Sequence, residues 1–374
     1  MRSFKGIMKL SRSTRFDKID GNSKFRIRAG SGNNRTDFQV DSTQAQKILL
    51  WLLVLREEKT LEEVEQQAIK IIGIGIKQAQ ELSAKFLDLG VLEESPDQVS
   101  EQIRDEWDKY GWRDAADFHI ACRNLKFVPD LDGGETYHKI YDELLSQPEF
   151  AGGQPPHYSP KETEQKFTIR HRSLNPEITV EEVFNRSKPI NKFIGTSPDW
   201  DAVIGAIRDG FSTQRLVKGS LGVHQQRPYP SGGARHPFEL YLVSDLESKG
   251  TYGTYWYDPL TEELNLQQDG IDKRAIDAAC FGKGGIVSSE IFIAISCRWS
   301  RHSWKYRYSR SYRMIMLELG HLVQSLNLNF RARGIDVFQC PSLHDSTWSE
   351  LLCLDDDCAE APVYILSLGT QGIL

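Results

Sequence analysis

The 374-residue sequence lacks the usual local signatures of catalytic and metal sites. It has no Walker phosphate loop, no HExxH zinc motif, no G-x-S-x-G turn and no GxGxxG stretch after a strand. Its six cysteines include no CxxC pair, and its nine histidines show no ligand-like spacing. Neither a metal site nor a disulfide framework is therefore predicted.

Long apolar runs and an excess of positive charge are also missing. The longest apolar run, 48–55, is eight residues, whereas a helix that crosses a bilayer needs about 20. No apolar segment follows the basic N-terminus, so no secretory signal is expected. A net charge of −6 with a pI near 5.9 does not favour nucleic-acid binding. We expect a soluble, reduced, cytoplasmic protein with no membrane and no nucleic acid among its partners.

The composition that is present is that of a folded protein, with 39% hydrophobic and 26% charged residues. The stretch PEFAGGQPPHYSP, residues 148–160, concentrates proline and glycine and predicts a linker at about 148–165. We predict three parts: an N-terminal domain over 1–95, a helical connector with linker over 96–164, and a larger domain over 165–374.

Residues 1–95 are predicted to form a winged-helix-like domain. Phe25 and Ile27 alternate with basic residues, and Phe38 with Val40 offers a partner strand. Three helices are indicated by their cap residues, which are Thr43 with Gln46, Thr60 with Glu63, and Gly90. The candidate recognition helix, KQAQELSAKFLDLG, balances two lysines with two acids, which argues against DNA. Peptide binding and simple packing both remain open.

Residues 165–374 alternate helix and strand signals, which is typical of the α+β class with helices on an antiparallel or mixed sheet. FELYLVS, IFIAIS and VYILSLG are suited to central strands. Thr179 with Glu182 predicts one helix start, and Ser197-Pro198 predicts a helix that runs to about Arg208. A long helix over 312–333 is apolar over most of its circumference, as in helices that pack against a second subunit.

Three segments of this domain could carry chemistry, although each also fits a structural interpretation. Arg186-Ser187-Lys188 could grip a phosphate or form a solvated turn. The stretch PYPSGGARHP, residues 228–237, could bring its backbone close to a flat or anionic ligand or be a stiff turn. Lys305-Tyr306 lies in RHSWKYRYSRSYR, where crowded cations would depress the lysine pKa; the alternative is a basic loop paired with the acidic run 355–357.

In this order, the three segments resemble the SagB-like dehydrogenases of the nitroreductase superfamily. These are FMN-dependent azoline oxidases that convert thiazolines and oxazolines in ribosomally made peptides, of the cyanobactin type among others, to thiazoles and oxazoles. PSGGARHPFELYLV resembles the proline-serine-glycine loop and following strand of that family. SWKYRYSRSYRMIMLELGHLVQ resembles its Lys-Tyr motif and buried helix, and NRSKPINKF its arginine-serine segment. The likeness covers about residues 180–370.

The resemblance implies a nitroreductase-like FMN domain and assigns its site. Lys305 and Tyr306 match the catalytic pair, and the residues do not decide which of them accepts the proton. FMN would be held by Arg186, Ser187, Lys188, Pro230, Ser231, Gly232, Gly233, Arg235 and Gln324. The chain departs from the family at Ser325, where Asn is common, and in the stretch FQCPSLHD, where glycines are expected.

The resemblance also implies partners: a second copy of the chain, a heterocyclised precursor peptide whose leader binds the N-terminal domain, and a cyclodehydratase. Two other functions stay open. One is a general FMN nitroreductase or quinone reductase, and the other is a non-catalytic winged-helix regulator that binds peptide or DNA. The sequence does not distinguish thiazoline from oxazoline, nor does it name the precursor peptide or the final electron acceptor.

Overall fold

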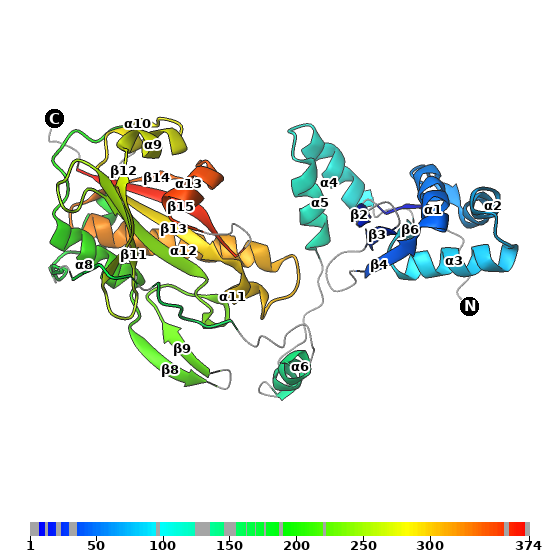
Figure 1. The fold of residues 1–374 in the computed structure, drawn as a ribbon, viewed down its shortest axis with the longest axis horizontal. Coiled ribbons are helices and arrows are strands. Elements are labelled where there is room, and N and C mark those ends of the chain that lie inside the picture. The colour runs from blue at the N-terminus through cyan, green and yellow to red at the C-terminus, as the bar shows by residue number, and fades with distance from the viewer. Residues whose placement is uncertain are drawn as a thin grey trace. The chain divides into compact units, whose positions relative to one another are not determined.

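The computed structural model describes residues 7–11, 14–19, 24–29, 36–94, 98–123, 135–145, 155–161, 163–168, 170–175, 177–186, 190–219, 222–354 and 359–370. The chain forms two compact units, residues 1–134 with 308–310 and residues 135–307 with 311–374 (Figure 1). The division into three parts at residues 95 and 164 remains a prediction.

The first unit contains two small antiparallel sheets and five helices among the described residues. Its elements are β1 (Ile7–Leu10), β2 (Arg15–Ile19), β3 (Lys24–Ala29), β4 (Thr36–Asp41), α1 (Ser42–Val54), β5 (Lys59–Thr60), α2 (Leu61–Ile72), α3 (Ile76–Asp88), β6 (Leu92–Glu94), α4 (Gln98–Asp108) and α5 (Arg113–Ala121). One sheet has the order β5-β1-β6 and the other β2-β3-β4.

The predicted pairing of the Phe25 and Phe38 segments is confirmed. Phe25 lies opposite Val40 and Ile27 opposite Phe38. However, β3 also pairs with β2 on its other side. The strand that carries Phe25 therefore has no free edge, and only β2 and β4 could accept an added strand in this sheet.

Helices α1, α2 and α3 enclose a core that includes Trp51, whose indole nitrogen donates to the carbonyl of Val64 at 3.1 Å. The capping box of Thr60 and Glu63 is confirmed at the start of α2. Gly90 has φ of 69° just beyond α3, as predicted for a glycine that ends a helix. Thr43 lies inside α1, which begins at Ser42, so it is not the first cap; local signals place helix ends only to within one or two residues. The winged-helix assignment remains a prediction.

The second unit is built on one large sheet. Its elements are α6 (Glu135–Leu145), β7 (Lys166–Phe167), α7 (Val180–Asn185), α8 (Trp200–Phe211), β8 (Arg215–Gly219), β9 (Gly222–Gln226), the 3₁₀ turn η3 (Gly232–Ala234), β10 (Phe238–Ser244), β11 (Tyr252–Tyr257), β12 (Leu264–Ile271), α9 (Lys273–Ala279), α10 (Gly284–Val287), β13 (Ile291–Arg298), α11 (Trp299–Ser303), α12 (Ser311–Ala332), β14 (Asp336–Cys340), α13 (Asp345–Leu351) and β15 (Glu360–Gly369).

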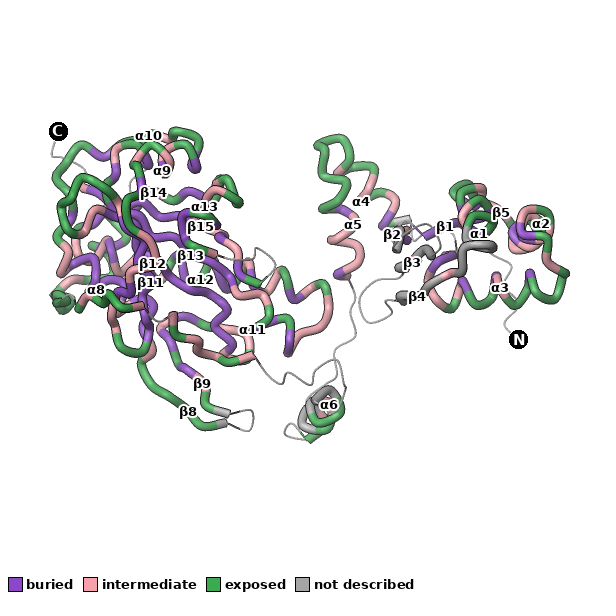
Figure 2. The backbone as a smooth tube through the Cα atoms, in the orientation of Figure 1, coloured by how far each residue is buried: buried purple, intermediate pink, exposed green. Residues whose placement is uncertain are grey.

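The sheet has the order β14-β15-β13-β10-β11-β12-β7, and its neighbouring strands are antiparallel. The three predicted central strands, FELYLVS, IFIAIS and VYILSLG, are β10, β13 and β15. Figure 2 shows β13 and β15 buried along most of their length, and every residue of β10 is buried. Alternate residues of β10 serve different cores: Leu240 packs with α8 and α12, whereas Tyr241 packs with α9 and α13.

Two helices differ from expectation. The helix predicted to begin at Ser197-Pro198 begins at Trp200, because the Asp199 carboxylate caps it and the Ser197 hydroxyl donates instead to Glu290. The long helix α12 is buried on the side facing the sheet, but Leu317, Gly320, His321 and Gln324 lie exposed on one side of it. Among the described helices, none has both the length and the apolar character to cross a bilayer.

Candidate functional site

Two of the predicted segments leave the sheet at the same end of neighbouring strands. The glycine loop, residues 230–235, runs into β10, and Lys305-Tyr306 follows α11 at the end of β13. Strands β10 and β13 are paired, with Phe238 opposite Cys297. This register brings together segments that are about 70 residues apart in the chain.

The glycine loop has a strained backbone. Gly233 has φ of 61°, and the non-glycine residues Ala234 and His236 have φ of 51° and 42°. Positive φ is costly for residues with a Cβ, and it clusters where a protein binds ligands. The Ser231 hydroxyl helps to hold the turn by accepting from the backbone N–H of His236 at 2.8 Å. Pro230 lies exposed at the entry to the loop.

Lys305 and Tyr306 press directly against this loop. A Cβ added to Gly233 would lie 2.7 Å from both Lys305 Nζ and Tyr306 Oη. The backbone N–H groups of both residues donate to the carbonyl of His302, at 3.1 and 3.0 Å, and so fix their position at the end of α11. The structure thus places the amine, the phenol and the glycine backbone in one cluster.

The amine of Lys305 is easier to deprotonate than an exposed lysine. Burial lowers its pKa first, and the nearby charge of Arg235 lowers it further. The predicted lowering of the Lys305 pKa is therefore confirmed, and Arg235 of the glycine loop is the nearby cation that contributes to it. Arg301, which the sequence pattern suggested for that role, forms a buried ion pair with Glu239 at 2.6 Å.

Arg235 is 1% exposed, and its side chain is bound from several directions. It donates to the carbonyls of Arg301 and Pro155 and lies 3.0 Å from His157 Nε2. Its guanidinium also lies over the ring of Trp304, 5.3 Å from the centroid. These contacts anchor Arg235, the last residue of the glycine loop, and its charge acts on Lys305. A contact between Arg235 and a cofactor remains a prediction.

Three histidines near the guanidinium of Arg235 are uncharged at neutral pH. Burial lowers the pKa of His302 and of His157 to about 4, and that of His236 to about 2. His302 is fully buried, its ring centroid lies 4.7 Å from that of Tyr306, and neither of its ring nitrogens has a hydrogen-bond partner in the part of the chain that the structure describes. At neutral pH, these imidazoles add polarity to the cluster without adding charge.

Sequence reasoning missed a carboxyl group in this cluster. Glu318 of α12 accepts a hydrogen bond from the backbone N–H of Gly232 at 3.2 Å and is 3% exposed. Burial raises its pKa to about 7, against the effect of hydrogen bonds from Ser231 and Gly232. The available signal was the single acid in the otherwise apolar run MIMLELGHLV.

The third segment lies elsewhere in the same chain. Arg186 donates to the carbonyls of Arg331 and Ala332, at 2.9 and 3.4 Å, near the end of α12. Ser187 and Lys188 lie outside the described residues. Because Glu318 and Arg331 are thirteen positions apart on one helix, Arg186 and the glycine loop meet α12 at points about 20 Å apart along its axis. Gln324 lies on the exposed side of α12 between them.

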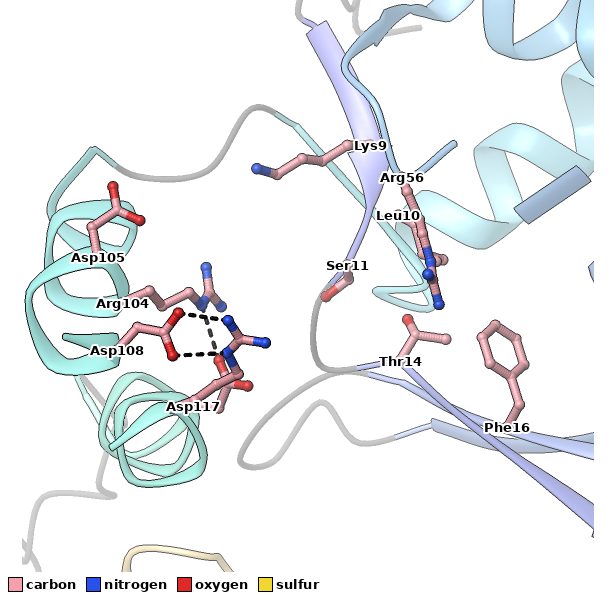
Figure 3. Close-up of a pocket in the computed structure, with 11 residues that line it drawn as sticks. Lys9, Leu10, Ser11, Thr14, Phe16, Arg56, Arg104, Asp105, Asp108 and Asp117 are labelled. Carbon is pink, nitrogen blue, oxygen red and sulfur yellow. Dashed lines mark hydrogen bonds and ion pairs between the residues drawn. The ribbon is translucent and has the colours of Figure 1, made fainter. Parts of the chain in front are cut away.

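The first unit contains a separate cavity of about 560 Å³ (Figure 3). Lys9 and Thr14 line one side, and residues of α4 and α5 line the other. Most of its charged side chains pair with one another, as Arg104 does with Asp117 at 2.9 Å. None of these residues belongs to a predicted site, and the paired charges specify no ligand.

Comparisons with known proteins agree with the architecture of the second unit. Residues 185–370 match the model of the nitroreductase family. The chain is 31% identical over 140 residues to the trifolitoxin-processing protein TfxB of Rhizobium leguminosarum bv. trifolii, covering 36% of this chain and 38% of that protein. It is 31% identical over 105 residues to the microcin B17-processing protein McbC of Escherichia coli, covering 27% of this chain and 38% of McbC.

The chain thus spans about two fifths of the length of both relatives. Among solved structures, it is similar to a chain of the E. coli microcin synthetase McbBCD complex with truncated pro-MccB17 bound. That alignment has 21% identity and a TM-score of 0.41, and it covers 67% of this chain and 99% of the other.

Proposed function

Residues 185–370 form a nitroreductase-family domain, and from this premise we propose that the chain is an FMN-dependent azoline oxidase that converts thiazolines or oxazolines of a ribosomally made precursor peptide to azoles. The contact of Gly233 with Lys305 and Tyr306 carries the proposal, because it joins the two motifs that resemble those of the SagB-like dehydrogenases. The names of TfxB and McbC, both described as processing proteins, support it.

The residues around the glycine loop fit a flavin. Glycines let a flat ring approach the backbone closely. The two ring nitrogens of His302 and Oε1 of Glu318 are buried without a hydrogen-bond partner among the described residues, and a ring edge that carries donors and acceptors can satisfy such atoms. Ser231, Gly232 and Gly233 are the residues proposed to contact the ring. Arg186, Ser187 and Lys188 are proposed to hold the phosphate.

In the proposed reaction, an azoline ring loses a proton from the peptide α-carbon and a hydride from the neighbouring ring carbon. When bound, the flavin supplies the acceptor for that hydride. Lys305 supplies the base: burial and Arg235 favour its neutral amine, which takes the proton and becomes an ammonium. Alternatively, Tyr306 carries the proton and Lys305 stabilises the phenolate. In either case the glycine loop packs over the pair and limits the access of water.

We expect the purified protein to be yellow and to release FMN, rather than FAD, on denaturation. The chain has no dinucleotide fingerprint, and its basic segment around Arg186 suits a single phosphate. Absorption spectroscopy followed by chromatography of the released cofactor measures this. A colourless protein that takes up no added FMN would contradict the enzymatic proposal and favour a non-catalytic peptide-binding function.

The separation of Arg186 from the glycine loop supports a homodimer. If both segments contact one flavin, points about 20 Å apart on α12 of one chain cannot both supply it, whereas two chains packed through this helix could. The exposed side of α12 offers Leu317, which is 66% exposed, beside Gly320 and Gln324. Association would remove this apolar surface from water.

We therefore expect sedimentation to give a dimer, and Leu317→Glu to weaken both dimerisation and flavin occupancy. The control is Leu216→Glu, which changes a leucine of β8 that is 57% exposed and lies away from α12. A monomeric L317E variant with full flavin occupancy would contradict a site assembled from two chains.

Residues 1–95 of the first unit are proposed to bind the leader of the precursor peptide. Strand addition is a common mode of peptide binding, and β4 provides an edge beside the Phe25–Phe38 pairing. A cyclodehydratase is proposed as a further partner, since it would supply the azoline rings.

Deletion of residues 1–95 is expected to lower kcat/KM for leader-bearing substrate about tenfold or more, because it removes contacts to the leader, which lies outside the reacting ring. Flavin occupancy should be unchanged. The matched control is a leaderless azoline peptide, whose oxidation the deletion should not affect. Equal efficiency of the truncated and full-length proteins on leader-bearing substrate would show that this unit has another use.

A further inference from the structure

Glu318 lies directly beneath the glycine loop. Its Oε2 accepts from the N–H of Gly232 at 3.2 Å. The neighbouring hydroxyl of Ser231, which lowers the pKa of this carboxyl, accepts from the N–H of His236. One carboxylate thus holds the backbone of the turn that carries Gly233. This contact joins α12 to a loop 86 positions away in the chain.

The charge of Glu318 is compensated only in part. Arg227 attracts the carboxylate, and Tyr229 and Cys297 are the titratable groups that face it and feel its charge. The guanidinium of Arg227 is engaged by Gln225 at 2.8 and 3.1 Å. Glu318 forms no ion pair with the residues that the structure describes. Burial therefore dominates and raises its pKa to about 7.

We propose that Glu318 is the positioning residue of the glycine loop: by accepting from the backbone N–H of Gly232, its ionised carboxylate holds Gly233 against Lys305 and Tyr306. An ionised carboxylate accepts a stronger hydrogen bond than a protonated one does. Protonation therefore weakens the bond from the Gly232 N–H, and the turn loses part of its support. This inference rests on the proposed function, because the loop is assigned to the flavin by that function.

The test measures FMN affinity of the wild type, Glu318→Gln and Ser325→Ala by flavin fluorescence between pH 5.5 and pH 9. The glutamine is nearly isosteric but does not titrate. Ser325 is the control because it lies on the same helix and donates to the carbonyl of Gly210, away from the loop. We expect wild-type affinity to fall about tenfold as the pH is lowered through 7, which corresponds to about one unit of pKa change on binding. The S325A variant should keep this pH dependence of FMN affinity, and the E318Q variant should lose it.

A second measurement needs no flavin. Because the folded pKa of Glu318, about 7, lies above the value of 4.5 for a free carboxyl, the wild type loses stability as the pH rises from about 4.5 to about 7 and loses no more above that. The thermal midpoint of the wild type should therefore fall relative to that of E318Q between pH 5 and pH 7 and then stay level.

The outcomes separate the two claims. A wild type that binds no flavin at any pH would overturn the proposed function. Flavin binding with the same pH dependence in the wild type and E318Q, or a pH dependence that S325A also loses, would overturn the role of Glu318 alone. Parallel stability profiles of the wild type and E318Q would do so as well, since they would show that this carboxyl does not titrate in the range.

Discussion

Lys305→Ala and Tyr306→Phe are each expected to slow azoline oxidation about 10²–10⁴-fold, the usual effect of losing a general base. The proton on the peptide α-carbon needs a nearby acceptor at neutral pH. Lys305 is suited to this task because burial and Arg235 lower its pKa. Lys305 Nζ and Tyr306 Oη lie equally close to the position that a Cβ on Gly233 would take. Single-turnover oxidation, followed by mass spectrometry as loss of hydrogen from each ring, measures the effect.

Flavin occupancy and peptide affinity should stay at wild-type levels in both variants. The matched control is Lys283→Ala, which removes another lysine of the second unit, one whose amine lies 3.8 Å from Cys340 Sγ rather than in the glycine-loop cluster. In the wild type, the rate should rise with pH through the lowered pKa of the base and then level off. A variant lacking both side chains that oxidises azolines at the wild-type rate would remove the pair from the mechanism.

Gly233→Ala is expected to lower turnover about 100-fold or more by displacing both proposed catalytic groups. The new methyl group would lie 2.7 Å from Lys305 Nζ and Tyr306 Oη, and misplacement of reacting groups by about 1 Å can cost that much in rate. The backbone adds a second penalty, because φ of 61° costs an alanine about 1–2 kcal/mol. Steady-state kinetics and thermal unfolding separate these two effects.

Gly250→Ala provides the control for the backbone penalty. Gly250 has φ of 81°, but nothing lies within 4 Å of the position that a Cβ would take. G250A should therefore lose stability by a similar amount and keep its turnover. If G233A were as active as G250A, the contact between the loop and the pair would have no part in catalysis.

Local patterns predicted much of the fold because the interactions behind them are local. The capping boxes of Thr60 and Thr179 each join residues three apart, and both are present. The apolar runs that became β10, β13 and β15 needed only β propensity. The helix start at Ser197 was misplaced because its hydroxyl found Glu290, 93 positions away, as a partner. A short stretch of sequence shows the possible local cap but not the distant residue that takes the same hydroxyl as its partner.

The site was predictable only as far as its motifs extend. The resemblance pointed to the glycine loop and to Lys305-Tyr306, which the fold brings together. It did not indicate that Arg235 lowers the pKa of Lys305 or that Glu318 lies under Gly232, since both contacts join elements far apart in the chain. It assigned Arg186 and the loop to one cofactor, with the loop reaching it from the other subunit or along its face; within one chain the two contact α12 at Arg331 and Glu318.

The pairing of β10 with β13 has a consequence for where the glycine loop and α11 meet. The register that places Phe238 opposite Cys297 fixes how the glycine loop and α11 are aligned at the end of the sheet. Each of the two strands packs into one hydrophobic core on one face and into a second core on the other. A slip of one residue would shift one segment by about 3.4 Å and turn its side chains to the opposite face. Substitutions within the loop or after α11 leave that frame intact. The sheet is therefore a fixed scaffold that sets where these two segments meet, whatever side chains they carry.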